Sequence, residues 1–562
     1  MEDIRFDTYY RYDAITSFLE KWAGEYPNLC QVDSIGESYE GRKIWVVTVT
    51  SLETGPAEEK PAYWIDANIH ASELAPSAAA LYLIHRLLNG YGNDKDVSHA
   101  LDTRAFYIVP RLNPDGAEWA LSDKPKYMRS STRPYPRDDK LDGLHQEDID
   151  GDGRILQMRI KDPLGNWKPH PEEPNLMVGR EPDDFSGEGT YRIFTEGFIQ
   201  NYDGVTIEVA PHLEGLDLNR NYTANWEPDE HGAGRFPTSE PEVRSAVKFI
   251  TDHPNITGAI TFHTFSAVNL RPLSIEPDES MPSQDLRTYK KIGEKGEALT
   301  GYPALSVYHD FRYDPKKHIR GTFDDWLYEH VGLYAWTTEI WSIQKQAGVE
   351  IKDHIEWFRD HPAEDDHKIY KWTVEHLGDQ GHVKWYEFDH PQLGSIELGG
   401  WNSLITWRNP PPAALEKEIA PLADFALLNC LISPKLELHS LTVDPHGDNY
   451  YVRLVLHNTG WLPTNVTQQA LEMKVVRELE VDIDLPEGAW LISGKKKTKL
   501  GQLSGRDDRQ GFAIWSNDST RERVKLEWMI HAPEGGQATI KAIHPRAGTV
   551  RTTVDFNEPV TG

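Results

Sequence analysis

Strand-like and helical stretches alternate along most of this 562-residue chain, and this alternation limits its fold more than any other feature. Apolar runs at 43–51, 63–69, 105–110, 256–263 and 334–341 are typical of strands, and helical patterns lie at 75–88, 240–253, 284–299 and 322–330. Such alternation is typical of an α/β domain. We therefore predict an α/β fold with a mixed, largely parallel central sheet flanked by helices.

The pattern of predicted elements changes after a proline-rich turn at 409–412 and a helical stretch at 413–431. From Leu436 onward, short alternating runs are separated by Gly, Pro and Asn-Asp turns, which is typical of an all-β sandwich. A chain of this length also exceeds one hydrophobic core. We predict a first, α/β domain at 1–432 and a β-sandwich accessory domain at 433–562, whose partner the sequence does not identify.

A segment rich in proline and aspartate, about 134–205, interrupts the alternation and is interpreted as an insertion in the first domain. Within it, Asp148, Asp150 and Asp152 occupy the first, third and fifth positions of a calcium-loop pattern, with Gly153 following. The twelfth position holds Arg159 in place of the expected acid. Calcium binding is therefore one interpretation, and a solvated acidic turn is the other.

Charge and composition exclude several classes of partner. The chain has 59 Lys and Arg against 89 Asp and Glu, a net charge of -30, which argues against nucleic acid or an anionic membrane as partner. Its two cysteines, Cys30 and Cys430, cannot form a disulfide framework of the kind small secreted domains use. No signal peptide or membrane-spanning stretch is readable. We expect a cytoplasmic protein.

The segment His70-Ala71-Ser72-Glu73 carries the strongest chemical signal. Its His and Glu follow directly after the strand-like run at 63–69, at the end of a strand where a parallel sheet collects its ligands. A catalytic zinc site needs three protein ligands of this kind and one position for water. So short a pattern also occurs by chance. A third candidate, His263, also follows an apolar run and lies at a strand end.

Further motifs follow in a fixed order: Asn113-Pro114-Asp115-Gly116, then Arg129, then Asn219-Arg220, then His263, then Glu339. The whole series resembles the zinc carboxypeptidase family, the carboxypeptidase A-like metallopeptidases, over residues 12–341, with 431 as the widest extent of the resemblance. The resemblance implies that His70, Glu73 and His263 hold one zinc ion. It also implies the zinc carboxypeptidase fold for the first domain.

The resemblance implies roles for the other residues too. Glu339 would be the general base and acid, and Arg129 would polarise the carbonyl that is attacked. Asn219 and Arg220 would grip the terminal carboxylate of a peptide, since a guanidinium can bind a carboxylate through two hydrogen bonds. Arg133 is a rival to Arg129, only four residues away.

The chain departs from the family pattern at two places. Ser72 replaces an Arg inside the HxxE motif, which removes one secondary contact to the substrate carboxylate. The position of the family's mobile Tyr falls on Lys317, and although Tyr308 and Tyr313 are nearby, neither is assigned that role. Asp324 resembles the pocket acid of the family's basic-specific branch, although it could instead cap a helix.

The function we predict is a zinc metallocarboxypeptidase that hydrolyses the C-terminal peptide bond of peptides. A preference for a basic C-terminal residue is a further hypothesis, based on Asp324 and the negative net charge. Two alternatives remain open. One is an amidase on cell-wall peptides or a deacylase of acyl-amino acids, and the other is a catalytically silent peptide-binding protein.

Overall fold

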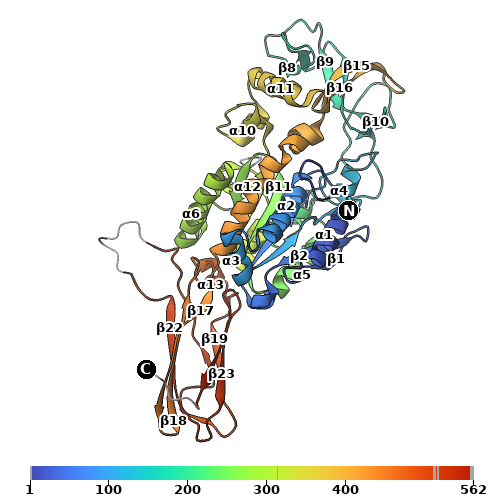
Figure 1. Cartoon of the computed structure of the whole chain (residues 1–562). Helices are drawn as coiled ribbons and strands as arrows, with labels where there is room; N and C mark the ends of the chain where they lie inside the picture. Colours follow the sequence, from blue (N-terminus) through green and yellow to red (C-terminus); the bar gives the residue numbers. More distant parts are fainter. Residues whose placement is uncertain (1–2, 313, 315, 510–513, 515–517, 557–562) are drawn as a thin grey trace.

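The computed structural model describes residues 3–312, 314, 316–509, 514 and 518–556. Figure 1 shows an elongated molecule with a helix-flanked sheet in its middle. One strand-rich region lies at each end of this central body. Within the described residues, no helix is both long and apolar enough to cross a membrane.

The central sheet has eight strands in the order β1-β2-β4-β3-β11-β14-β12-β13. The strands are β1 (Cys30–Glu37), β2 (Lys43–Val49), β3 (Ala62–Ala67), β4 (Ala105–Val109), β11 (Ile256–Thr264), β12 (Val268–Arg271), β13 (Ala304–Ser306) and β14 (Tyr334–Ile340). The pairs β3–β4, β3–β11, β11–β14 and β12–β13 are parallel, and the others are antiparallel. The predicted mixed, largely parallel sheet is thus confirmed.

Helices cover both faces of this sheet (Figure 1). Trp64 on β3 packs against Phe249 of α5, with ring centroids 5.4 Å apart, whereas Trp336 on β14 packs against Phe425 of α12 at 5.8 Å. The main helices are α1 (Tyr12–Glu25), α2 (Ala75–Gly90), α5 (Pro241–Asp252), α6 (Ser283–Thr300) and α12 (Pro412–Leu431). Burial of these large rings on opposite faces fixes the layered core.

The remaining α-helices of the described chain lie outside this central pair of layers or are short. They are α3 (Lys95–Thr103), α4 (Pro114–Ala120), α7 (Val307–Asp310), α8 (Phe323–Trp326), α9 (Ile343–Gln346), α10 (His354–Arg359), α11 (Ala363–Leu377) and α13 (Gln468–Glu472). The helix predicted at 322–330 is α8 followed by a π-type turn at Leu327–Val331.

Three neighbouring parallel strands bring the predicted site together. β3, β11 and β14 lie side by side, so their carboxyl ends share one edge of the sheet. His263 on β11 is paired directly with Glu339 on β14. Because side chains at paired positions point to the same face, these two residues face a common space.

Strands from two distant segments form a structure that we call the cap, residues 143–200 and 382–401. The cap contains β5 (Gly143–Gln146), β6 (Gln157–Lys161), β7 (Trp167–Pro169), β8 (Met177–Gly179), β9 (Tyr191–Thr195), β10 (Gly197–Gln200), β15 (His382–His390) and β16 (Gly394–Trp401). Six of these strands form one sheet in the order β15-β16-β6-β9-β7-β8. The insertion expected at 134–205 is therefore not self-contained, because β16 supplies the partner of β6.

The C-terminal strands form two four-stranded antiparallel sheets, β17-β18-β22-β20 and β21-β19-β23-β24. Their bounds are β17 (Leu436–His446), β18 (Asn449–Asn458), β19 (Glu480–Asp484), β20 (Trp490–Ser493), β21 (Lys497–Lys499), β22 (Arg523–His531), β23 (Gln537–His544) and β24 (Gly548–Asp555). Residues from both sheets, such as Leu454, Trp528 and Ile540, share one hydrophobic cluster. This arrangement confirms the predicted β-sandwich, and the domain boundary at 432 stays a prediction.

Buried charges join the sandwich to the central body. Arg546 donates hydrogen bonds to the carbonyl oxygens of Val331 and Gly332, at 2.6 and 3.1 Å. Asp285 on α6 accepts backbone N–H bonds from Gln468 and Gln469 at the start of α13. These contacts satisfy polar groups that would otherwise be buried without partners.

Candidate active site

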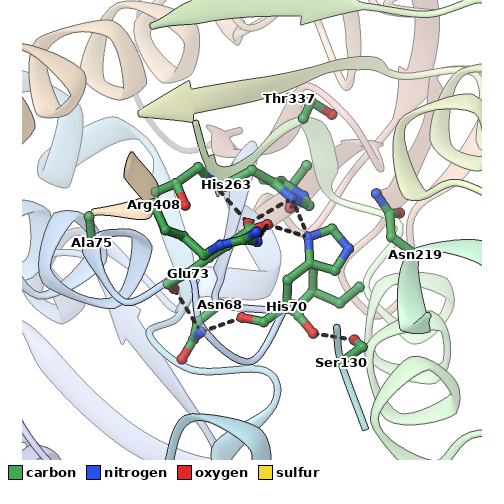
Figure 2. Close-up of polar contacts among 12 residues, drawn as sticks. Asn68, His70, Glu73, Ala75, Ser130, Asn219, His263, Thr337 and Arg408 are labelled. Carbon is green, nitrogen blue, oxygen red and sulfur yellow. Dashed lines mark hydrogen bonds and ion pairs between the residues drawn. The ribbon is translucent and has the colours of Figure 1, made fainter. Parts of the chain in front are cut away.

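A network of hydrogen bonds fixes the loop that carries His70 and Glu73 (Figure 2). Asn68 adopts a positive φ of 59° and donates from Nδ2 to the carbonyl oxygens of His70 and Glu73, at 2.7 and 2.8 Å. Ser130 Oγ donates to the carbonyl of Ile69 at 2.6 Å. The loop backbone is therefore held on two sides, as a preorganised site requires.

The side chains of His70, Glu73 and His263 converge on one buried point (Figure 2). His70 Nδ1 lies 2.9 Å from Glu73 Oε1 and 3.1 Å from His263 Nδ1, and His263 Nδ1 lies 3.4 Å from Glu73 Oε2. Two imidazole nitrogens and one carboxylate are a ligand set that zinc accepts. The structure thus brings together all three predicted metal ligands.

The Nε2 atoms of His70 and His263, which do not face Glu73, indicate that these three side chains can hold a cation. His70 Nε2 lies 3.1 Å from Asp217 Oδ1, and His263 Nε2 lies 3.2 Å from Thr261 Oγ1. Acceptors at both Nε2 atoms favour the tautomers that carry the proton there and leave each Nδ1 lone pair facing the centre. Two lone pairs at 3.1 Å repel each other unless a cation lies between them. The donor set therefore fits zinc.

Asp217 is a site residue to which the sequence analysis gave no role. Its carboxylate contacts His70 and also accepts from Arg129 Nε at 2.9 Å, with Arg220 Nη1 at 4.0 Å. Although burial opposes ionisation, the charges of Arg129, Arg220 and His70 hold the pKa of Asp217 well below its usual value. The only sequence signal was its place two residues before Asn219.

Glu339 lies beside the three candidate metal ligands, His70, Glu73 and His263, which we call the triad. One carboxylate oxygen of Glu339 has no hydrogen-bond partner in the described part of the chain. Its Oε2 is buried and has no hydrogen-bond partner among the residues that the structure describes. Burial, and then the charge of Glu73, raise the pKa of Glu339 well above its usual value, while Arg129 and Arg408 oppose this rise. A carboxylate oxygen left without a partner is costly and suits a group that exchanges a proton with a ligand.

Arg129, and not its rival Arg133, reaches the site. Arg129 lines a cavity of about 350 Å³ that also includes Glu73 and Glu339, and its Nη1 lies 3.3 Å from Glu73 Oε1. Arg133 instead donates from Nε and Nη2 to both oxygens of the buried Glu240, at 3.0 and 2.6 Å. The two arginines four residues apart therefore have separate environments.

The predicted substrate-binding residues pack against one another next to the triad. Asn219 Oδ1 accepts the N–H of Phe323 at 2.9 Å, and Gly321, at a φ of 65°, lies against the carbonyl of Arg220. A Cβ at Gly321 would lie 2.3 Å from that oxygen, so this approach requires glycine. Arg220 Nη1 donates to the carbonyl of Asn219 at 2.7 Å.

Asp324 is buried on the same side of the sheet as Glu339. Its Oδ2 accepts a hydrogen bond from Thr337 Oγ1 at 3.0 Å, and Thr337 lies two residues before Glu339 on β14. The helix α8 has Thr322 at its N-cap position and no side-chain cap. Asp324 Oδ1 also accepts the backbone N–H of Asp325 at 3.1 Å, so both alternatives for Asp324 stay predictions.

Arg408 is a second site residue that the sequence analysis missed. It lines the same cavity of about 350 Å³ as Arg129, which we call the catalytic cavity, and it lies 3.9 Å from Glu73 Oε1. The next residue, Asn409, accepts the N–H groups of Leu74 and Ala75 at 2.7 and 3.0 Å and donates to the carbonyl of Ser72 at 2.8 Å. It thus supplies the cap that helix α2 lacks from its own N-cap residue.

The structure shows the surroundings of the two positions that depart from the family pattern, Ser72 and Lys317. Ser72 is buried, and no side-chain charge comes from that position. Lys317 is exposed, while Phe311 lines the catalytic cavity. Tyr308 stacks on His318 at 6.0 Å, and Tyr313 lies outside the described residues. The role of the mobile Tyr stays unassigned.

The predicted calcium set is only partly assembled. Asp148 and Asp150 lie close to Glu196, whereas Asp152 forms an ion pair with Arg154. Both oxygens of Asp148 accept backbone N–H bonds from the loop, at 2.7 and 2.9 Å. These bonds account for the loop shape without an ion, and the calcium site stays a prediction.

Comparisons with known proteins cover both parts of the chain. A family model described as zinc carboxypeptidase matches residues 15–356, and one described as a domain of unknown function matches residues 435–555. The chain is 26% identical over 219 residues to carboxypeptidase B of Astacus astacus, covering 39% of this chain and 63% of that protein. It is 31% identical over 110 residues to carboxypeptidase M of Mus musculus, covering 20% and 25%.

The matches thus span less than two thirds of the length of these curated relatives. Among solved structures, thrombin activatable fibrinolysis inhibitor matches with a TM-score of 0.42 and 16% identity. That match covers 76% of this chain and 74% of the other.

Proposed function

The chain belongs to the zinc carboxypeptidase family, as the order of its motifs predicted, and from this we propose that it is a zinc-dependent metallocarboxypeptidase. It hydrolyses the C-terminal peptide bond of peptides. One observation carries this proposal: the nitrogens and carboxylate of His70, Glu73 and His263 meet within 4.8 Å, with Glu339 paired to His263 on the next strand.

In this proposal His70, Glu73 and His263 hold the metal, and Glu339 moves the proton. Zinc held there would supply Lewis-acid activation of water and of the peptide carbonyl. Glu339 accepts a proton from the attacking water and then gives it to the leaving amine. Its Oε2, which has no hydrogen-bond partner among the described residues, supports this exchange.

Arg129 and the Asn219–Arg220 pair would hold the substrate. Arg129 lies in the cavity beside Glu339, where its guanidinium can stabilise negative charge that develops on the carbonyl oxygen. Asn219 and Arg220 bind the terminal carboxylate, which restricts cleavage to the end of a chain. Their packing against Gly321 and Phe323 supports a fixed position for this pair.

A preference for C-terminal Arg or Lys is the finer part of the proposal. Asp324 is buried and accepts a hydrogen bond from Thr337, two residues before Glu339 on β14, so it lies on the same side of the sheet as Glu339. A buried carboxylate at the end of a side-chain pocket favours a cation. The net charge of -30 would also attract basic peptides.

The test combines metal analysis with a substrate panel. We expect one zinc per chain and release of the C-terminal residue from peptides ending in Arg, Phe or Glu, fastest for Arg. The panel includes acyl-amino acids and peptides of D-amino acids, because cleavage of these alone would favour the deacylase or amidase alternative. Zinc binding without hydrolysis of any member would favour a silent binding protein.

A further inference from the structure

Two cavities meet at a pair of arginines. The catalytic cavity of about 350 Å³ and a second cavity of about 530 Å³ both include Arg129 and Arg408 in their linings. The second cavity runs from Ser72 to the cap, where Gln157 and Trp401 line it. A molecule in the catalytic cavity can therefore extend past the two guanidinium groups toward the cap.

The segment that carries Arg408 is fixed to both halves of the catalytic site. Asn409 bonds to the loop that carries Glu73, as described above. The carbonyl of Thr406 accepts from Trp341 Nε1 at 2.9 Å, and Trp341 follows the strand that carries Glu339. Arg408 is thus held in place by its neighbours, although it lies outside the residues that the zinc carboxypeptidase model matches.

The position of Arg408 relative to the metal ligands gives a direction to the substrate. In Figure 2, His70 and His263 lie between Arg408 and Asn219. If Asn219 and Arg220 hold the terminal carboxylate, the residue on the amino side of the scissile bond extends toward Arg408. The second cavity, with Trp407 and Trp401 in its wall, lies further along the same path.

The charges at this junction favour an anion. Glu73 and Glu339 line the catalytic cavity together with Arg129, Arg359 and Arg408. Arg129 also pairs with Asp217, and Arg359 pairs with Glu356. A divalent metal on the triad would add two positive charges beside them. A carboxylate brought in by the substrate would therefore meet a positive field and at least one guanidinium of fixed position.

We propose that Arg408 binds a carboxylate on the substrate residue immediately before the scissile bond, so that peptides with an acidic residue there are preferred. The cap cavity then takes the residues that precede it. This inference rests on the proposed carboxypeptidase function. It adds a specificity for the amino side of the bond, whereas Asp324 concerns the C-terminal residue.

The test uses acetyl-Glu-Arg and acetyl-Gln-Arg, which differ only in the charge of the residue before the bond. For the wild-type zinc enzyme we expect kcat/KM to be roughly tenfold higher for the Glu peptide, mainly through KM, because a charged hydrogen bond is worth about that factor. In Arg408→Gln the ratio should fall to about one, because kcat/KM for the Glu peptide falls more than kcat/KM for the Gln peptide. Arg408→Lys should restore part of the preference.

The control is Arg192→Gln, which removes an arginine of the cap that pairs with Asp162 and lines neither cavity. This variant should keep the wild-type ratio. Equal rates for the two peptides in the wild type would overturn the inference. So would a loss of kcat in Arg408→Gln that is the same for both peptides, because Arg408 would then act on the reaction itself.

A calorimetric titration separates this inference from the proposed function. If neither peptide is hydrolysed, the carboxypeptidase proposal fails, and binding of both peptides to the zinc-loaded protein is measured instead. Tighter binding of acetyl-Glu-Arg that is lost in Arg408→Gln would still support the anion site. Equal affinities would refute it.

Discussion

The edge of the central sheet and the C-terminal sandwich differ in how they place charged side chains and in how regular their backbone is. At the sheet edge, Glu73 and Asp217 both contact His70, Glu339 is paired with His263 on the next strand, and Asn68 adopts a positive φ. In the sandwich, β23 simply alternates exposed or partly buried residues with buried ones such as Ile540. Clustered acids and strained backbone are costly to stability, so they persist where chemistry requires them.

This contrast has a direct consequence for mutagenesis. Substitutions at the sheet edge should change metal binding and turnover more than stability. Substitutions inside the sandwich should change stability and leave turnover per folded molecule intact.

The largest change is expected from removing a metal ligand. His263→Asn should lose zinc and reduce peptide hydrolysis to the level of a buffer blank, because a three-ligand site cannot be completed. Zinc content and initial rates measure this. A chelator should have the same effect on the wild type, and added zinc should reverse it. Full turnover without metal would contradict the site.

In the sandwich core, Trp528→Ala should lower the free energy of unfolding by about 3–5 kcal/mol, because it empties a large buried volume. Trp528 is 1% exposed, whereas Trp490, at 54%, offers a matched control. Trp490→Ala should change stability by no more than about 0.5 kcal/mol. Denaturant unfolding measures both. A fall in the kcat of folded Trp528→Ala protein would contradict the expectation that the sandwich affects stability and not turnover.

Asp217→Asn should weaken zinc binding by roughly 10–100-fold, because Asp217 orients His70 and increases its basicity. Competition with a chelating dye gives the zinc affinity. The matched control is Asp285→Asn, which alters a buried acid at the junction with the sandwich and touches no metal ligand. An equal loss of zinc affinity in both variants would show that Asp217 acts through the fold alone.

The smallest change concerns pH. Burial lowers the pKa of His544 to about 3 from an ordinary 6.5, so the unfolded chain binds a proton that the folded sandwich does not. The free energy of unfolding should therefore fall as the pH drops below 6.5. Between pH 7 and 5.5, His544→Asn should lose about 1 kcal/mol less than the wild type. Urea unfolding of both proteins at pH 7 and at pH 5.5 tests this. Equal losses of unfolding free energy in the wild type and in His544→Asn would refute it.

Local patterns were enough to predict the sheet and to single out His70, Glu73 and His263 as candidates, whereas their role as one zinc-binding set came from the resemblance to the zinc carboxypeptidase family. His70, Glu73 and His263 each follow or end an apolar strand, and parallel strands bring such ends to one edge. The sandwich could also be predicted, because strands such as β18, β22 and β23 alternate between buried and more exposed residues. These predictions rest on residues close together in the sequence.

What could not be predicted depends on pairing between distant segments. The cap joins β6 to β16, and Arg408 reaches Glu73 from more than 300 positions away, so no local pattern indicates either. The sequence indicated a lost charge at Ser72 but not the guanidinium that Arg408 brings to the cavity that Ser72 lines. The choice between Arg129 and Arg133 likewise required the buried partner of Arg133, Glu240.

The central claim is that Glu339 moves the proton while the triad holds the metal. The most direct test is the zinc content and kcat of Glu339→Gln on the best peptide of the panel. We predict one zinc per chain, an unchanged melting temperature and a kcat lower by about 10²–10⁴-fold. A variant that keeps its zinc and hydrolyses the peptide at the wild-type rate would contradict the account.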